Sequence, residues 1–179
     1  LCLNGYSLTS AYEYGTVIIN DNATLNVTDC GNDGKIANTG SYRTGNAIVT
    51  SSDGVNITLN LYSGTLEANT GCAYYNDADE NCVFNQYGGK VTTSTTDPQT
   101  GTVTMLDGCG KYNLYGGSVE NTNAYWTVYA TGENTQLSMS GTAQINKPVW
   151  VKNRIVITGV LTPPASAYVI CYMSRNQTG

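Results

Sequence analysis

Short runs of alternating apolar and polar residues recur along the chain, and each run closes on a glycine. The clearest copies span residues 59–64 and 112–117, and a second short run after each glycine leads to an Asn-Thr pair, ending at Thr70 and at Thr122. Alternation of this kind predicts β-strands, because successive side chains of a strand point to opposite faces. The apolar spacing of three and four that marks a helix does not recur. We therefore expect an all-β chain.

The recurring glycine sets a period for the whole sequence. Steps of 18 to 30 residues separate the marker glycines Gly5, Gly34, Gly64, Gly89, Gly117, Gly141 and Gly159. Such a period is typical of a solenoid, and glycine suits its bends because it adopts positive φ. The sequence thus predicts an all-β, right-handed parallel β-helix solenoid of about six to seven rungs, a rung being one turn of the coil. Residues 1–179 would form a single domain, and we expect them to be a fragment of a larger protein.

Asparagines recur shortly after the second run of each clear repeat. Asn38, Asn69 and Asn121 take this position. If they stack on successive rungs, their amides are expected to hydrogen-bond along the solenoid axis as an asparagine ladder.

Tyrosine is unusually frequent, with 14 copies against one phenylalanine. Tyr62, Tyr87 and Tyr115 each lie two positions before a marker glycine, so they are expected to stack on rungs about 4.8 Å apart. If Leu61 and Leu114 point inward, the alternation turns these tyrosines outward. They would then form a flat aromatic strip on which a sugar ring or a protein packs. The alternative is an internal aromatic stack.

A second aromatic group follows the Asn-Thr pairs, in the segments of variable length between strands. Its members are Tyr42, Tyr74, Tyr75, Tyr125 and Trp126. Loops on a rigid scaffold often carry recognition residues, and tyrosine and tryptophan are enriched at binding hot spots. We predict that these five residues form one ligand-binding surface, with the Tyr62 strip as the next candidate. The competing interpretation is that they plug the open side of the coil.

Six cysteines in a chain without histidine favour disulfides over a metal site. The rung alignment places Cys2 beside Cys30 and Cys82 beside Cys109, each pair one residue out of register and within bridging distance. These are the disulfide candidates. The rival to the second pair is a disulfide between Cys72 and Cys82. A further alternative is that all six cysteines stay reduced and act as small buried hydrophobic residues.

Charge and hydropathy exclude two kinds of partner. The net charge is -5, and the eight lysines and arginines are scattered, whereas binding to nucleic acid needs clustered cations. No run of about 18 apolar residues is present, so we expect no membrane insertion.

Catalytic signatures are weak. The absence of histidine removes Ser-His and Cys-His pairs and imidazole metal ligands. A polysaccharide hydrolase would need carboxylates that converge on one face, and the acidic cluster at residues 77–80 is better interpreted as a solvated loop, with a calcium site as the minor alternative. A lyase would need a basic residue, for which Lys90 and Lys111 are the nearest candidates. We expect no catalytic residue, no metal and no cofactor.

The chain resembles right-handed parallel β-helix domains of adhesin-like surface proteins of Gram-positive, often gut-dwelling, bacteria. The resemblance is carried by residues 1–8, 18–20, 23–29 and 34–36 and by the later Leu-x-x-Gly-x-Leu/Val rungs. It implies that the 179 residues belong to a larger surface protein. Such domains share a fold with pectate lyases and polygalacturonases, but a fold does not transfer an activity. The resemblance implies an extracellular, surface-bound or secreted recognition module without catalysis. Its partner would be a glycan or a host glycoprotein such as an immunoglobulin. A polysaccharide lyase or hydrolase and a passive structural stalk are the alternatives.

Overall fold

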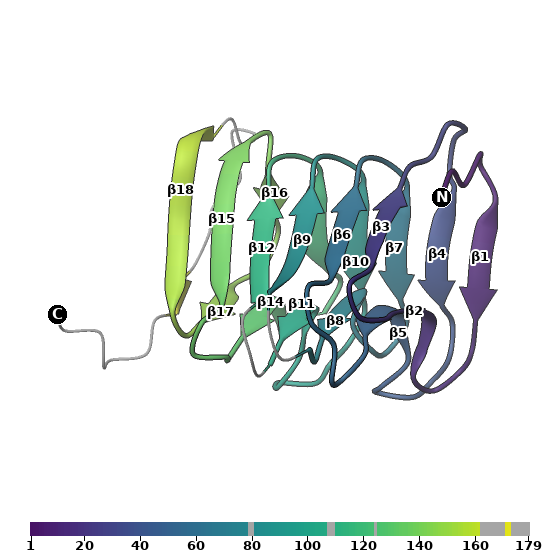
Figure 1. The fold of residues 1–179 in the computed structure, drawn as a ribbon, viewed down its shortest axis with the longest axis horizontal. Coiled ribbons are helices and arrows are strands. Elements are labelled where there is room, and N and C mark those ends of the chain that lie inside the picture. Colours follow the sequence, from purple (N-terminus) through teal and green to yellow (C-terminus); the bar gives the residue numbers. More distant parts are fainter. Residues whose placement is uncertain (79–80, 107–109, 124, 162–170, 173–179) are drawn as a thin grey trace, which may run out of the picture.

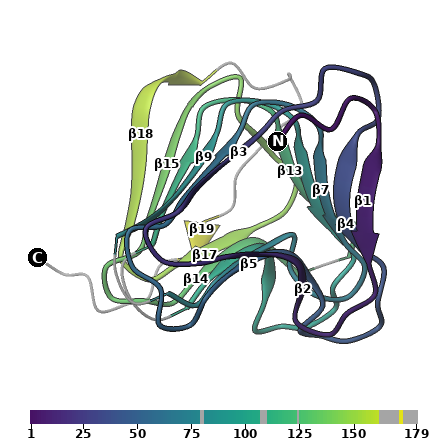
Figure 2. The same ribbon diagram turned by 45° about the vertical axis from the view of Figure 1, so that its right-hand side comes forward.

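A computed structural model describes residues 1–78, 81–106, 110–123, 125–161 and 171–172. Over these residues the chain forms strands joined by turns and loops. The described part contains no helix, and hence none long and apolar enough to cross a membrane. Three parallel sheets surround one interior, as three sides of a coil (Figures 1 and 2). The predicted all-β solenoid is confirmed.

Sheet 1 has a buried apolar inner face. Its strands are, in spatial order, β1 (Ser7–Ser10), β4 (Lys35–Asn38), β7 (Thr65–Ala68), β10 (Lys90–Thr93), β13 (Ser118–Asn121) and β16 (Gln144–Ile145). Ile36, Leu66 and Val119 occupy equivalent positions on β4, β7 and β13, and each is fully buried. The strands therefore stack in the register that the repeat predicts.

Sheet 2 carries apolar residues on both faces. Its strands are β2 (Gly15–Ile19), β5 (Asn46–Thr50), β8 (Tyr74–Asn76), β11 (Gly101–Met105), β14 (Trp126–Ala130), β17 (Val149–Val151) and β19 (Cys171–Tyr172). Ile48 and Tyr74 point into the core, whereas the next residues, Val49 and Tyr75, pair across the same strands and point outward. Strands that are apolar on both faces are typical of sheets with both faces covered.

Sheet 3 completes each turn. Its strands are β3 (Thr24–Val27), β6 (Thr58–Leu61), β9 (Cys82–Gln86), β12 (Gly110–Leu114), β15 (Gln136–Gly141) and β18 (Arg154–Leu161). From β1 the chain returns to sheet 1 five times, so the described residues make about five full turns, slightly fewer than the rung count expected. The right hand of the coil stays a prediction, and it agrees with the usual hand of parallel crossovers.

One continuous core runs through the coil. Leu61, Leu66, Leu114 and Val119 all have no exposed area, which confirms the predicted inward positions. Burying each such side chain stabilises the fold by about 1.5–3 kcal/mol relative to leaving it exposed.

The inner surface also holds an aromatic stack. Phe84 lies between Tyr74 and Tyr112, with both centroid distances at 4.8 Å. Gln86, the polar residue that breaks the inward pattern of its rung, is fully buried and accepts a hydrogen bond from the Tyr112 hydroxyl. Its amide also donates to the Ser118 carbonyl at 3.2 Å. A buried polar side chain is tolerated here because the neighbouring rungs supply its hydrogen bonds.

The corner between sheets 3 and 1 requires glycine. Gly64, Gly89 and Gly117 have φ values of 88°, 73° and 78°. A Cβ on Gly117 would lie 2.3 Å from the Gly89 carbonyl oxygen, so the stacked corners approach too closely for a side chain. The marker position is therefore a structural corner.

Two markers differ from this pattern. At Gly34 the positive φ falls instead on the preceding Asp33, at 68°. Gly159 lies inside strand β18, whose pairing with β15 shifts register between Met139 and Gly141. The prediction that Gly159 marks a corner was wrong, because a register shift extends the strand past it.

The asparagine ladder forms at different residues from those predicted. Asn38 donates to the Tyr12 carbonyl at 2.9 Å, Asn69 to the Gly40 carbonyl at 3.2 Å, and Asn121 to the Trp126 carbonyl at 3.0 Å. These asparagines lie where the chain leaves sheet 1, and the backbone carbonyls of the corner need donors. Backbone groups therefore take the amides that were expected to bond one another.

The amide ladder lies on the outer face of sheet 3. Asn60 donates to Asn26 at 2.8 Å, Asn85 to Asn60 at 2.9 Å, and Asn113 to Asn85 at 2.8 Å. All four residues pair in register within strands, where the backbone is already satisfied by the sheet. Their amides are thus available to bond along the axis.

Candidate functional site

A groove with a volume of about 740 Å³ lies on the outer face of sheet 2. Its floor is a row of outward side chains in register, Ile18 on β2, Val49 on β5 and Tyr75 on β8. We call it the sheet 2 groove. Its position follows from strand alternation, since the inward neighbours of these residues build the core.

Two sets of loops wall the groove. The loops that lead from sheet 1 into sheet 2 contribute Arg43, Thr44, Asp97 and Thr100, and those that follow sheet 2 contribute Ser51, Ser52 and Asp77. The walls are therefore mainly polar, and the floor is apolar. A hollow of this composition is typical of small-ligand sites.

The N-terminal end of the groove is aromatic. Tyr14 lines it and is 56% exposed, and its ring lies 5.5 Å from that of Tyr12 between centroids. Asn38 donates to the Tyr12 carbonyl, and Asn46 donates to the Tyr14 carbonyl at 3.3 Å. The buried asparagines of one turn thus fix the backbone below the exposed tyrosines of the preceding turn.

An ion pair between Arg43 and Asp97 crosses the wall of the groove. Arg43 lies between β4 and β5, and Asp97 between β10 and β11, so the pair skips the intervening turn, whose corner at residues 69–73 is shorter. The Asp97 side chain is only 7% exposed and also accepts a hydrogen bond from the Gln99 amide at 2.9 Å, whereas Arg43 is 72% exposed. A buried carboxylate therefore holds an exposed guanidinium at the groove.

The outward row continues beyond the groove but is interrupted. Thr104, which pairs with Tyr75, is fully buried and accepts a hydrogen bond from the Cys72 thiol at 3.2 Å. Tyr129 and Trp150 follow in register on β14 and β17. Sheet 2 is thus lined by large side chains on both sides of Thr104.

The five predicted loop aromatics do not form one surface. Tyr42 and Tyr125 are exposed, Tyr75 lines the groove, and Trp126 donates to the Pro98 carbonyl at 2.9 Å and is half-buried. Tyr74 is only 1% exposed, so its prediction as a ligand contact was wrong. Tyr74 and Tyr75 are neighbours in a strand, and neighbours in a strand cannot face the same side.

The strip of Tyr62, Tyr87 and Tyr115 points outward as predicted. Its side chains are 47%, 46% and 39% exposed, and the internal aromatic stack is made by other residues. The ring centroids are 5.0 and 5.2 Å apart, with interplanar angles of 8° and 18°. Nearly parallel rings at this distance stack with an offset, so each ring covers part of its neighbour's face and the strip offers less open ring face than the flat platform expected. It is better suited to stabilising the corner than to stacking with a sugar.

Free thiols occur at Cys2, Cys30 and Cys72. Cys2 and Cys30 are exposed free thiols that hydrogen-bond to each other, an interaction that lowers the pKa of Cys2 and raises that of Cys30. Their predicted proximity is confirmed, but the predicted disulfide is not formed. Cys82 pairs in register with Gly110, and its candidate partner Cys109 lies outside the described residues.

The rival bond between Cys72 and Cys82 is also not formed. Cys82 belongs to the core, whereas Cys72 lies below the sheet 2 groove and donates to Thr104. Burial raises the pKa of the Cys72 thiol to about 12, so this cysteine remains a neutral hydrogen-bond donor.

The residues considered for catalysis are dispersed. Asp77 lines the groove, and the rest of its acidic cluster, residues 79–80, lies outside the described residues. Lys90 bonds Glu120 at 2.7 Å on sheet 1, and Lys111 lies exposed on sheet 3. Neither lysine lines the sheet 2 groove. In the part of the chain that the structure describes, no three His, Cys, Asp or Glu side chains gather as a metal site.

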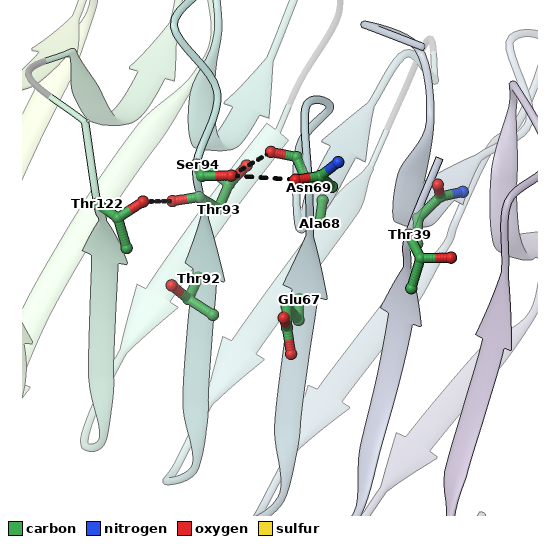
Figure 3. Close-up of a pocket in the computed structure, with 9 residues that line it drawn as sticks. Thr39, Glu67, Ala68, Asn69, Thr92, Thr93, Ser94 and Thr122 are labelled. Atoms are coloured by element: carbon green, nitrogen blue, oxygen red, sulfur yellow. Dashed lines mark hydrogen bonds between the residues drawn. The ribbon is translucent and has the colours of Figure 1, made fainter. Parts of the chain in front are cut away.

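A smaller pocket of about 240 Å³ lies along the ends of the sheet 1 strands (Figure 3). Its hydroxyl and amide groups donate to the backbone of the preceding turn. Ser94 donates to the Asn69 carbonyl at 2.5 Å and Thr122 to the Thr93 carbonyl at 3.3 Å. The Asn-Thr pairs noted in the sequence therefore close the corners between turns.

Sequence reasoning missed Tyr14, Ile18, Arg43 and Asp97. A signal for the floor was nevertheless present, because residues 17–19, 47–49 and 73–75 are each consecutive apolar triplets. In an alternating strand such a triplet places one apolar side chain outside. The ion pair had no comparable signal, since its partners are 54 residues apart.

No protein-family model matches the chain, and neither a curated protein nor a solved structure matches it. The geometry defines the class of protein as a three-sided parallel β-solenoid. Its distinguishing feature is an apolar groove between polar walls on one outer face.

Proposed function

We propose that this chain is a non-catalytic recognition module whose sheet 2 groove binds a glycan. The observation that carries the proposal is the outward row of Ile18, Val49 and Tyr75, held between polar loops on three successive turns. A contiguous apolar hollow with a polar rim on a folded surface is typical of a binding site.

The chemistry of a sugar matches this arrangement. A pyranose has an apolar ring face that packs on aromatic and aliphatic side chains, and hydroxyls at its edge that exchange hydrogen bonds. Tyr14 and Tyr75 offer rings, while Ser51, Ser52 and Thr44 offer hydroxyls. The groove supplies both halves of this recognition.

The biological setting follows from the resemblance of the repeats to bacterial surface adhesins. We propose an extracellular location, on a bacterial surface or secreted, and a partner that is a host or environmental glycan. A host glycoprotein such as an immunoglobulin would present the same chemistry through its attached sugars. The proposal requires no cofactor, nucleic acid or membrane insertion.

A polysaccharide lyase or hydrolase is the second candidate, and one observation favours it. Asp77 and Asp97 line the same groove, and glycoside hydrolysis uses paired carboxylates. Asp97, however, is buried, is paired with Arg43 and accepts a hydrogen bond from the Gln99 amide, so its carboxylate is already engaged within the wall of the groove. We therefore propose binding without turnover.

A glycan array, run beside a pull-down from host glycoproteins, tests the function directly. The wild-type chain is expected to bind glycans, and Tyr75→Ala is expected to lose about 2 kcal/mol of binding free energy, near thirtyfold in affinity. Tyr62→Ala is the matched control, because it removes the same side chain from a different outer surface. Circular dichroism checks that both variants fold.

Three results would contradict the proposal. Binding that is lost in Tyr62→Ala but kept in Tyr75→Ala would move the site to the tyrosine strip. Glycan cleavage abolished by Asp77→Asn would establish the enzyme. If the wild-type chain binds no glycan, the passive stalk would be the remaining function.

A further inference from the structure

We infer that the sheet 2 groove selects neutral saccharides and rejects acidic ones, an inference that rests on the proposed function. The starting observation is the charge of the groove. Among the described residues that line it, Asp77 and Asp97 carry negative charge and Arg43 carries the single positive charge. The lining therefore has a formal net charge of -1, on a chain whose own net charge is -5.

The cation of the groove is already matched by a carboxylate. Arg43 pairs with Asp97. The Asp97 side chain is only 7% exposed, so it stays fixed beside the guanidinium. A carboxylate or sulfate on a sugar would have to compete with this preformed partner for Arg43. A neutral sugar needs only a hydrogen bond, and the 72% exposed Arg43 side chain still has N–H groups beyond the one that bonds Asp97.

Asp77 then determines the response to ligand charge. It is half-buried at the wall opposite Arg43, in a hollow where water screens charges less than on an open surface. A carboxylate accepts hydrogen bonds from sugar hydroxyls but repels a second anion. The same group thus favours a neutral sugar and disfavours a uronic acid, a sialic acid or a sulfated sugar, which is selection by repulsion.

The remaining polar groups of the walls are neutral. Thr44, Ser51, Ser52 and Thr100 line the groove with hydroxyls. Hydroxyls recognise other hydroxyls without a preference for charge, so they add affinity for both kinds of sugar and do not offset the repulsion at Asp77.

The test uses pairs of glycans that differ only in charge. One pair is homogalacturonan in fully methyl-esterified and de-esterified forms, and the other is mucin before and after sialidase treatment. Both are immobilised beside an array of neutral, sialylated, uronic and sulfated glycans. The wild-type chain is expected to bind neutral members at least about tenfold more tightly than their acidic counterparts. Raising the salt concentration from about 0.05 to about 1 M is expected to narrow this ratio, because salt screens the repulsion.

Asp77→Asn isolates the residue responsible. This variant keeps the size of the side chain and is expected to bring the ratio of neutral to acidic affinity close to one, mainly by tightening the acidic member. Asp33→Asn is the control, because Asp33 is exposed at the corner between sheets 3 and 1 and changes the net charge equally. It is expected to leave the ratio as in the wild type.

The outcomes separate the inference from the function it rests on. Tyr75-dependent binding of acidic glycans as tightly as neutral ones, or a ratio unchanged in Asp77→Asn, overturns the inference and leaves glycan binding standing. Absence of binding to every member of the array and of both pairs overturns both.

Discussion

Two outer surfaces of this solenoid carry tyrosines, and they are built differently. In the strip, Tyr62, Tyr87 and Tyr115 repeat the same ring, and each ring stacks on the next at 5.0 or 5.2 Å. In the sheet 2 groove, Tyr75 follows two aliphatic residues, Ile18 and Val49, in the same row. Each ring of the strip covers part of the next, whereas the row of Ile18, Val49 and Tyr75 forms the floor of a hollow of about 740 Å³.

The comparison shows that aromatic content alone does not mark a binding site. Face-to-face rings give their interaction energy, about 0.5–1.5 kcal/mol per pair, to the fold. The groove leaves its apolar floor available to a ligand, and walls of hydroxyls and charges surround it. We therefore expect the strip to contribute to stability, and we propose the groove as the surface for recognition.

The largest expected change in stability distinguishes the inner face of sheet 2 from its outer face. Tyr74→Ala removes a ring that is 1% exposed and packs on Phe84, so it is expected to lower the free energy of unfolding by about 3–5 kcal/mol. Tyr75→Ala, one residue later, is expected to change it by less than about 1 kcal/mol. Urea denaturation measures both. Equal losses would mean that the groove floor is part of the core.

Gly117→Ala introduces a side chain at the corner that supports the strip. The new Cβ would lie 2.3 Å from the Gly89 carbonyl oxygen at a φ of 78°, so we expect a loss of about 2–3 kcal/mol in unfolding free energy. Gly159→Ala is the control, because its Cβ would have no contact closer than 3.6 Å. If Gly117→Ala leaves the unfolding free energy unchanged in the same denaturation experiment, the corner tolerates a side chain.

Tyr87→Ala removes the middle ring of the strip. It loses both stacking contacts, and we expect a loss of about 1–2 kcal/mol in unfolding free energy with no change in glycan affinity. Tyr87→Phe keeps the stacked ring and is expected to retain nearly all of the stability. Weaker glycan binding by Tyr87→Ala would assign recognition to the strip.

The smallest effect concerns acid stability at the strip's N-terminal end. The Asp29 carboxylate accepts hydrogen bonds from the amides of Gly5, Gly34 and Gly31, and these bonds hold its pKa below its ordinary value of 3.8. A carboxyl with a lowered folded-state pKa stabilises the fold above its unfolded-state pKa, and this contribution is lost as the pH falls through the lowered pKa.

Asp29→Asn is therefore expected to flatten the acid side of the stability profile. Urea midpoints measured between about pH 5 and about pH 2 check this, with Asp33→Asn as the control because Asp33 is an exposed acid at the same corner. An acid profile identical to that of the wild type would show that other carboxyls dominate the loss.

Much of the fold followed from local pattern. The alternating runs predicted the strands, and the glycine at Gly64 and Gly117 predicted the corners, because positive φ and close stacking exclude other residues there. The inward positions of Leu61 and Leu114 then turned Tyr62 and Tyr115 outward. Each of these predictions depends on a residue and its immediate neighbours.

The errors share a different cause. Asn38 and Asn121 were expected to bond other asparagines, but the corner carbonyls beside them took their amides. The position of Tyr74 after Thr70 favours the surface, but the alternation of strand β8 turns Tyr74 inward and Tyr75 outward. Gly159 was placed at a corner although strand β18 continues through it.

The sequence by itself determined the all-β solenoid, its core and its outward tyrosine strip, because strand alternation and the steric limits of glycine are properties of a few adjacent residues. Only the tertiary structure decided that Ile18, Val49 and Tyr75 share one floor and that Arg43 meets Asp97 across an intervening turn. Those relations depend on loop lengths and on register between turns. When turns stack, a small difference in register changes which side chains become neighbours. A local sequence pattern does not contain this information.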